Sequence, residues 1–217
     1  MPLSAPLGEL VATGPSLGKN WIPTCYTASG QKCRWDIDMR LNKRIITRRF
    51  MLREFLPEDV EQFVAYQTDP AFTIFHRQDE LGDAQAQRVF QLFLDWQESS
   101  PRYNYQLAIS PLNDDSKLIG SCGIRMDGCV QGEAVFGVEF ARPYWGRYRY
   151  PQEISEALIG WGFDELKLSA LIADTAFENT AVARLAESAG FVRTHAGDKQ
   201  WWHLDRSAWI ARRARQG

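Results

Sequence analysis

Several hallmarks of other protein classes are scarce or missing in this chain of 217 residues. It has only four cysteines and three histidines, and no two cysteines stand at the Cys-x-x-Cys spacing of a zinc site. The sequence therefore predicts no metal centre. No apolar run approaches the length that crosses a bilayer, so we expect no membrane partner.

An excess of charge of one sign is also lacking. Lys and Arg number 25 against 27 Asp and Glu, for a formal charge of -2 and a pI near 6.0. Net charge thus gives no support to a nucleic-acid partner, although arginines cluster locally at 40–53 and 206–215. The few cysteines, and a start without a charged-then-apolar leader, favour a cytoplasmic location.

The composition that remains is typical of a globular protein, with 45% apolar and 24% charged residues. The length suits one domain, or one domain with an appendage. Residues 1–44 are rich in Gly, Pro, Ser and Thr and lack periodicity, which predicts an N-terminal arm before a domain at 45–217. The arm is interpreted as a packing strap, with a lid or a dimerisation arm as the alternatives.

Hydrophobic periodicity predicts a mixed sheet with flanking helices. Strands are expected at 45–54, 103–109, 117–126, 133–140, 168–174, 191–195 and 199–204, and helices at 57–67, 83–98, about 151–167 and 179–190. Asn179 is a suitable N-cap for the last helix, and Gly190 is a suitable stop. An antiparallel meander followed by a crossover helix indicates a fold of the α/β or α+β kind.

The stretch from Pro143 to Tyr150 joins the fourth expected strand to a helix. It is a Gly-containing, Arg-rich turn. Such a junction brings free backbone N–H groups and the positive end of a helix to one point, which suits a phosphate. Taken alone the pattern is weak, because most strand-turn-helix junctions bind nothing.

Four motifs in family order resemble the GNAT superfamily of acetyl-coenzyme-A-dependent N-acetyltransferases. They are FMLREF at 50–55 with PED at 57–59, LIG at 118–120, GVEFARPYWG at 137–146, and the run from Asn179 through LAESAGF at 185–191. The chain looks most like the ribosomal-protein N-terminal acetyltransferases and their small-molecule relatives. The resemblance covers roughly three quarters of the chain and leaves out residues 1–44.

The resemblance implies a central sheet splayed between its fourth and fifth strands, and acetyl-coenzyme A as co-substrate. It implies coenzyme contacts from Phe140, Ala141, Trp145, Gly146, Arg147, Tyr148, Arg149, Tyr150 and Asn179. Where the family has a second glycine, this chain has Tyr148, and its turn is one residue longer. Arg147 and Arg149 offer bidentate donors to phosphate, and Tyr148 or Tyr150 can stack on the adenine.

Candidate catalytic groups follow from the chemistry of acetyl transfer to an amine, which needs a base and an acid. Glu133 and Glu139 lie on the fourth strand an even number of residues apart, so they face one side of it. The family's helix hydroxyl is absent, since Val182 stands where this branch often has serine. Tyr144 is the substitute acid among the side chains, with water or the thiol as alternatives.

These features predict an enzyme that transfers acetyl from acetyl-coenzyme A to a primary amine by direct attack in a ternary complex. The acceptor partner would be a small-molecule or peptide amine. Two alternatives stay open. The chain is a catalytically silent member of the fold that binds an acyl-coenzyme A or a partner, or an assembly protein that forms a homodimer through residues 1–44.

Overall fold

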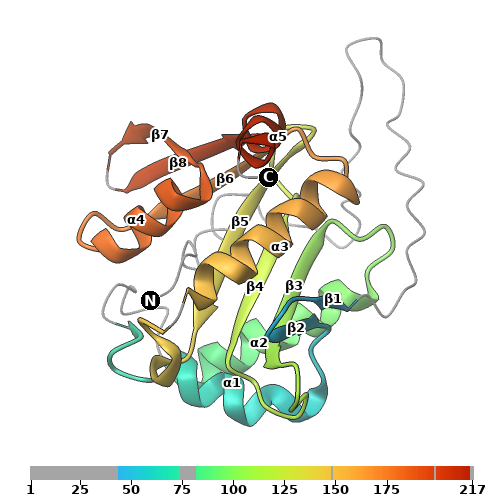
Figure 1. The fold of residues 1–217 in the computed structure, drawn as a ribbon. Helices are drawn as coiled ribbons and strands as arrows, with labels where there is room; N and C mark the ends of the chain where they lie inside the picture. Colours follow the sequence, from blue (N-terminus) through green and yellow to red (C-terminus); the bar gives the residue numbers. More distant parts are fainter. Residues whose placement is uncertain (1–43, 74–81, 148, 198, 216–217) are drawn as a thin grey trace.

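The computed structural model describes residues 44–73, 82–147, 149–197 and 199–215 (Figure 1). Its strands are β1 (Ile45–Ile46), β2 (Phe50–Arg53), β3 (Asn104–Pro111), β4 (Gly120–Arg125), β5 (Glu133–Phe140), β6 (Ala170–Thr175), β7 (Val192–Ala196) and β8 (Gln200–Asp205). Its helices are α1 (Val60–Gln67), α2 (Asp83–Glu98), α3 (Tyr150–Asp164), α4 (Thr180–Ala189) and α5 (Arg206–Ala214), with 3-10 turns η1 (Pro57–Asp59) and η4 (Arg142–Tyr144). The predicted arm, apart from its last residue, and Tyr148 lie outside the described residues.

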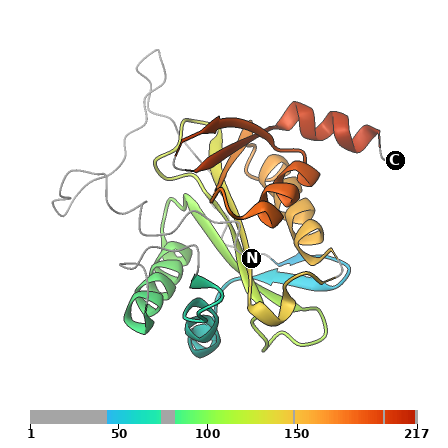
Figure 2. The same cartoon turned by 90° about the vertical axis from the view of Figure 1, so that its left-hand side faces the viewer.

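The strands form one sheet in the order β1-β2-β3-β4-β5-β6-β8-β7. Every neighbouring pair is antiparallel except β5 and β6, which are parallel. Helices α1 and α2 cover one face, and α3 and α4 cover the other (Figure 2). The predicted mixed, mostly antiparallel sheet with flanking helices is therefore confirmed.

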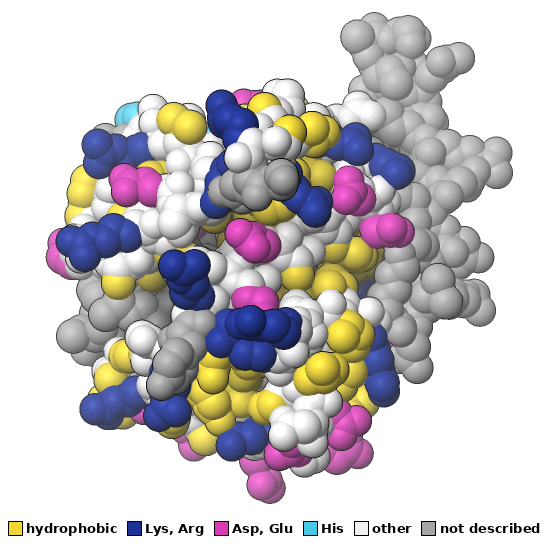
Figure 3. Space-filling model, viewed as in Figure 1, with side chains coloured by type: hydrophobic (Ala, Val, Ile, Leu, Met, Phe, Trp, Pro, Cys, Tyr) yellow, Lys and Arg dark blue, Asp and Glu magenta, His cyan; other side chains and the backbone are white. Residues whose placement is uncertain are grey.

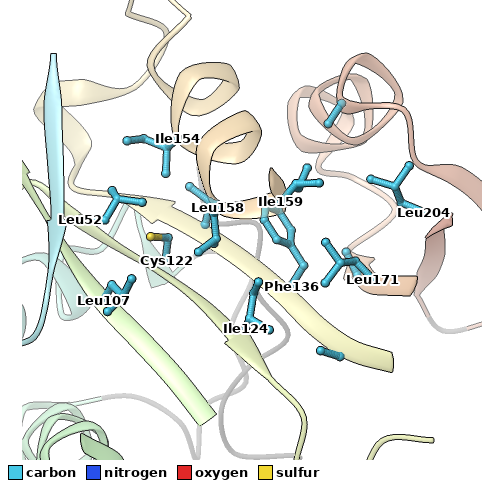
Figure 4. Packing of buried hydrophobic residues seen from close by; sticks show 14 of the residues in the cluster. Leu52, Leu107, Cys122, Ile124, Phe136, Ile154, Leu158, Ile159, Leu171 and Leu204 are labelled. Carbon is cyan, nitrogen blue, oxygen red and sulfur yellow. The ribbon is translucent and has the colours of Figure 1, made fainter. Parts of the chain in front are cut away.

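Each face of the sheet has its own apolar core. On the α3 side, alternate β5 residues, among them Phe136 and Phe140, pack with Leu158 and Ile159 (Figure 4). On the α1 and α2 side, phenylalanines such as Phe63 and Phe93 form the second cluster. Full burial of one such side chain contributes about 1.5–3 kcal/mol, so the two clusters fix the sheet between its helices.

One predicted strand was wrong, and one helix was missed. The first strand is interrupted after Ile46 by a turn in which Thr47 and Phe50 bond each other, and β1 folds back antiparallel on β2. The basic stretch 206–215, interpreted only as a charged patch, forms helix α5. Its Trp209 is buried against the core.

Strands β5 and β6 separate part-way along their length. They pair only where Glu133, Ala134 and Val135 face residues 170–172, although β5 continues to Phe140 and β6 to Thr175. This is the predicted splay. It leaves the last five residues of β5 without a β6 partner, beside the start of α3.

None of the helices in the described part of the chain is long and apolar enough to cross a membrane.

Candidate active site

The turn between β5 and α3 has the backbone of an anion site. Gly146 and Arg149 both adopt positive φ, at 68° and 59°. Within the described residues, no hydrogen bond is made by the N–H groups of Gly146 and Arg147, and the space beside the Gly146 Cα is open. Free N–H groups next to the positive end of α3 are suited to binding a phosphate.

The left-handed position before the helix belongs to Arg149, the N-cap residue of α3. A glycine would normally fill it, because an L residue with a Cβ is strained there. In the sequence we placed the missing second glycine at Tyr148. The backbone angles assign that conformational role to Arg149 instead.

Arginines gather around the first turns of α3. A hollow of about 650 Å³ is lined by Arg48, Arg49, Arg149 and Arg212 together with polar residues of α3. Basic and acidic side chains alternate on this face of the molecule (Figure 3). Arg49 is held by Glu153 through its Nε at 2.7 Å and lies over the Tyr150 ring at 4.5 Å, so it fixes the helix start.

Aromatic residues close the turn against the splay. The Trp145 indole N–H donates to the Phe140 carbonyl at 2.6 Å, which occupies a backbone group that we predicted to face the coenzyme. Tyr144 is half-buried in η4, and the Lys117 amine lies 5.7 Å from its ring centre. A hydrogen bond with the Tyr144 hydroxyl raises the pKa of Lys117.

Glu139 is the centre of a buried hydrogen-bond cluster on the α1 face of the sheet. Its Oε1 accepts from the Tyr66 hydroxyl at 2.8 Å, the Gln67 amide at 2.8 Å and the Ser121 hydroxyl at 2.7 Å. Burial, and next the charge of Glu139, raise the pKa of Tyr66 well above its usual value, so this donor keeps its proton. The cluster holds a carboxylate in one orientation, 4% exposed, in the splayed half of β5.

Glu133 occupies the other end of the same strand. Strand alternation puts it on the same face as Glu139, as predicted, but six residues and thus about 20 Å away. It pairs with Ala170 in the unsplayed half of the ladder, and it lines a separate hollow of about 150 Å³ under the turn between β4 and β5. The structure does not bring the two candidate bases together.

Two further polar residues on this face, Gln106 and Arg125, were missed in the sequence. Gln106 donates to Ser121 at 3.0 Å, extending the Glu139 cluster to β3. Arg125 on β4 is buried, and burial lowers its pKa, while the charges of Glu139 and Asp174 act in the opposite direction. Only the strand order brings these residues to one place, since their separations in sequence carry no local signal.

The sequence profile of the acetyltransferase (GNAT) domain matches residues 49–192, about two thirds of the chain. The chain belongs to the GNAT acetyltransferase family. The family's fold explains why the splay, the turn and the N-terminus of α3 lie together.

Other GNAT proteins resemble the chain at a distance. An uncharacterised N-acetyltransferase, p20 of Bacillus licheniformis, is 27% identical over 148 residues, covering 68% of this chain and 81% of p20. Two Vibrio cholerae structures share the fold. A protein provisionally assigned as a ribosomal-protein-serine acetyltransferase has a TM-score of 0.61 at 20% identity, covering 76% of this chain and 98% of its own. Spermidine N-acetyltransferase, solved with CoA and spermine, has a TM-score of 0.61 at 16% identity, covering 74% and 98%.

Helix α4 of this GNAT domain begins as predicted. The Asn179 side chain accepts from the Val182 N–H at 3.3 Å, and Gly190 ends the helix at a φ of 97°. Val182 and Ala186 are buried, and Leu185 is half-buried, so the positions expected to carry an acid have no hydroxyl. In the described residues, no group of three or more His, Cys, Asp or Glu could hold a metal ion.

Proposed function

We propose that this GNAT protein transfers acetyl from acetyl-coenzyme A to a primary amine, of a protein N-terminus or of a small molecule, in a ternary complex. The motif at 137–146 supports a place in the branch of the ribosomal-protein N-terminal acetyltransferases and their small-molecule relatives. The co-substrate supplies an activated acetyl thioester. The chain's own residues bind its phosphates, orient the amine and accept the amine proton.

One observation carries this proposal. A buried carboxylate, Glu139, lies in the splayed half of β5, and the same strand leads directly into a turn with free N–H groups. The splay can admit a thin pantetheine chain between β5 and β6, which would bring the thioester within reach of Glu139. Glu139 is therefore our choice of base over Glu133, which lies in the paired half.

The neighbouring residues receive roles consistent with this geometry. The turn 146–150 and the hollow beside Arg149 and Arg212 would hold phosphates, with Tyr150 against the nucleotide. Phe140, Ala141, Trp145 and Asn179 would line the pantetheine path. Tyr144, whose hydroxyl contacts Lys117, is the side chain we propose for returning a proton to the departing thiol.

A second candidate is a catalytically silent member of the fold. It is favoured by the Trp145 indole, which already occupies the Phe140 carbonyl, and by the absence of a hydroxyl at Val182. Such a protein would bind acyl-coenzyme A without turnover. The assembly role proposed for residues 1–44 lies outside the described residues.

Calorimetry with acetyl-coenzyme A and desulfo-coenzyme A, followed by transfer assays on a panel of amines, separates these functions. The proposed enzyme binds both coenzymes and acetylates at least one amine. Gly146→Trp should abolish binding, because a side chain at this positive-φ position fills the open space of the turn. Binding without transfer to any amine supports the silent alternative, and no binding at all excludes both.

Two matched variants test the choice of base. Glu139→Gln removes the negative charge with little change of shape and should lower kcat by 10²- to 10⁴-fold, roughly the range of general-base catalysis. Glu133→Gln is the control and should leave kcat unchanged. The opposite pattern would move the base to Glu133.

A further inference from the structure

The face of the sheet that carries Glu139 also holds buried polar groups for which the described part of the chain supplies no hydrogen-bond partner. Arg125 is 2% exposed and Gln106 is 5% exposed. Within the described residues, the Nε and Nη2 atoms of Arg125 and the Oε1 atom of Gln106 are buried and have no hydrogen-bond partner. Orphaned buried groups of this kind are rare and costly, so they indicate a partner that binds from outside.

The two orphaned nitrogens of Arg125 are not an arbitrary pair. Nε–H and the outer Nη2–H point in parallel along one edge of the planar guanidinium. This edge matches the two oxygens of a carboxylate in a bidentate pair. The unsatisfied part of Arg125 is therefore one complete recognition edge.

Two glycines form the surface of the sheet beside this edge. Gly123 of β4 and Gly137 of β5 are directly paired, and they lie between the positions of Ser121 and Arg125. The Gln106 amide oxygen occupies the place where a Cβ on Gly123 would be. Because Gln106 also donates to Ser121, its free acceptor is held beside the Glu139 cluster.

Two carboxylates act on the Arg125 guanidinium. They are Glu139 and Asp174, and Lys199 lies 3.1 Å from Asp174. A ligand with a carboxylate would satisfy the guanidinium edge, whereas a polyamine carries only cations and would leave it unsatisfied.

We propose that Arg125 binds a carboxylate of the acceptor, so that the acceptor is a small amine carrying a carboxylate, such as an amino acid. This inference rests on the proposed function. The acceptor amine would lie between the Gln106 oxygen and Glu139, which takes its proton. Arg125 lies four residues from Ser121 on β4, a backbone separation of about 13 Å. Ser121 pairs with Glu139. The arginine and glutamate side chains shorten the distance between their charged groups to the length of a small ligand.

Binding without chemistry tests the inference. The protein saturated with desulfo-coenzyme A is titrated calorimetrically with a panel of L-amino acids, their α-amides and the corresponding decarboxylated amines. We expect at least one amino acid to bind about 10- to 100-fold more tightly than its amide, the loss typical of a charged hydrogen-bond pair. Equal affinity for the amide, tighter binding of the amines, or no binding of any amino acid overturns the proposal.

Arg125→Lys gives a second readout. It keeps the positive charge and removes the two parallel N–H donors of the guanidinium. We therefore expect amino-acid binding to weaken about 10- to 100-fold and binding of the amide to stay unchanged. Arg102→Lys is the matched control, because the Arg102 guanidinium already pairs with Glu54, so this change should alter neither affinity. If Arg125→Lys does not fold, the ratio of amino acid to amide in the unaltered protein still decides the question.

Failure here is distinguishable from failure of the proposed function. Acetylation of diamines or of peptide N-termini, with amino acids unreacted, would keep the acetyltransferase and remove the carboxylate site. Water alone would then satisfy Arg125.

Discussion

Arg149 has a strained backbone conformation and lies in the proposed phosphate site. Its φ of 59° and ψ of 28° lie in the left-handed region, which costs an L residue about 1–2 kcal/mol. An exposed arginine at this place is compatible with selection for its guanidinium, which lines the hollow beside α3. Strain retained at one position of a turn is common where the turn binds a ligand.

Replacing this residue should separate the two effects. Arg149→Gly is expected to raise the free energy of unfolding by about 0.5–1 kcal/mol, because glycine adopts positive φ without strain, and to weaken coenzyme binding. Urea unfolding and calorimetry measure the two changes. Arg147→Gly, which removes an arginine two residues away where φ is not positive, should give no stabilisation. Equal stabilities of the two variants would show that Arg149 is not strained.

At the scale of single elements, helix α5 was not predicted from the sequence. The run 206–214 contains four charged or polar residues around Trp209, so its sequence pattern is dominated by polar positions and not by its one buried apolar residue. Trp209 is 4% exposed, and its ring centre lies 6.5 Å from that of Phe163 on α3. The helix therefore docks through a single large side chain.

The Trp209→Ala variant should lose about 3–5 kcal/mol of unfolding free energy, the usual cost of removing a buried aromatic side chain. Chemical denaturation followed by circular dichroism measures it. Ile210→Ala is the control on the same helix, since Ile210 is 55% exposed, and it should change stability by less than about 0.5 kcal/mol. Similar losses of unfolding free energy in both variants would contradict the proposal that Trp209 alone holds α5 on the domain.

Helix α4 allows a test of its cap. Asn179→Ala should cost about 1 kcal/mol, because the Val182 N–H loses its acceptor, whereas Asn179→Asp keeps an acceptor and should recover most of that loss. Thermal unfolding compares the three proteins. An Asn179→Ala protein as stable as the original would leave the coenzyme contact as the reason for Asn179.

The elements were largely predictable, and the site was only partly so. The limits of β5 and α2 follow from their periodicity and flanking turns, and the predicted ranges agree with the structure. The break between β1 and β2 did not stand out, since the alternation of apolar residues continues through it. The roles of Arg125 and Gln106 could not be predicted. The alternation of apolar and polar residues along a strand tells which face of the sheet a residue occupies, but not which strands lie beside it.

At the scale of the whole molecule, burial of weak acids sets the response to alkali. Burial, and next the charge of Glu139, raise the pKa of Cys122, and burial also raises the pKa of Tyr66 and Tyr105. In the unfolded chain the thiol loses its proton above about pH 8.5 and the phenols above about pH 10. Stability is therefore full below those values and is lost as pH rises toward the folded-state pKa values.

The Cys122→Ala variant isolates the thiol's share. Between pH 8.5 and 9.5, one thiol that ionises only on unfolding contributes up to about 1.4 kcal/mol of lost stability per pH unit. Urea midpoints across this window should fall less steeply for Cys122→Ala than for the unaltered protein, whatever the offset from the smaller side chain. Parallel pH dependences of the two proteins would show that Cys122 does not cause the loss of stability in this pH range.

The contact between Trp145 and the Phe140 carbonyl also makes the protein its own optical probe. An indole whose N–H is engaged in a hydrogen bond emits at a wavelength that depends on that bond, and this bond lies beside the splay through which we propose that the coenzyme passes. Adding coenzyme should therefore shift the intrinsic fluorescence, and Trp145→Phe should abolish the shift while the other seven of the eight tryptophans still emit. Occupancy of the splay could then be followed in real time without a label.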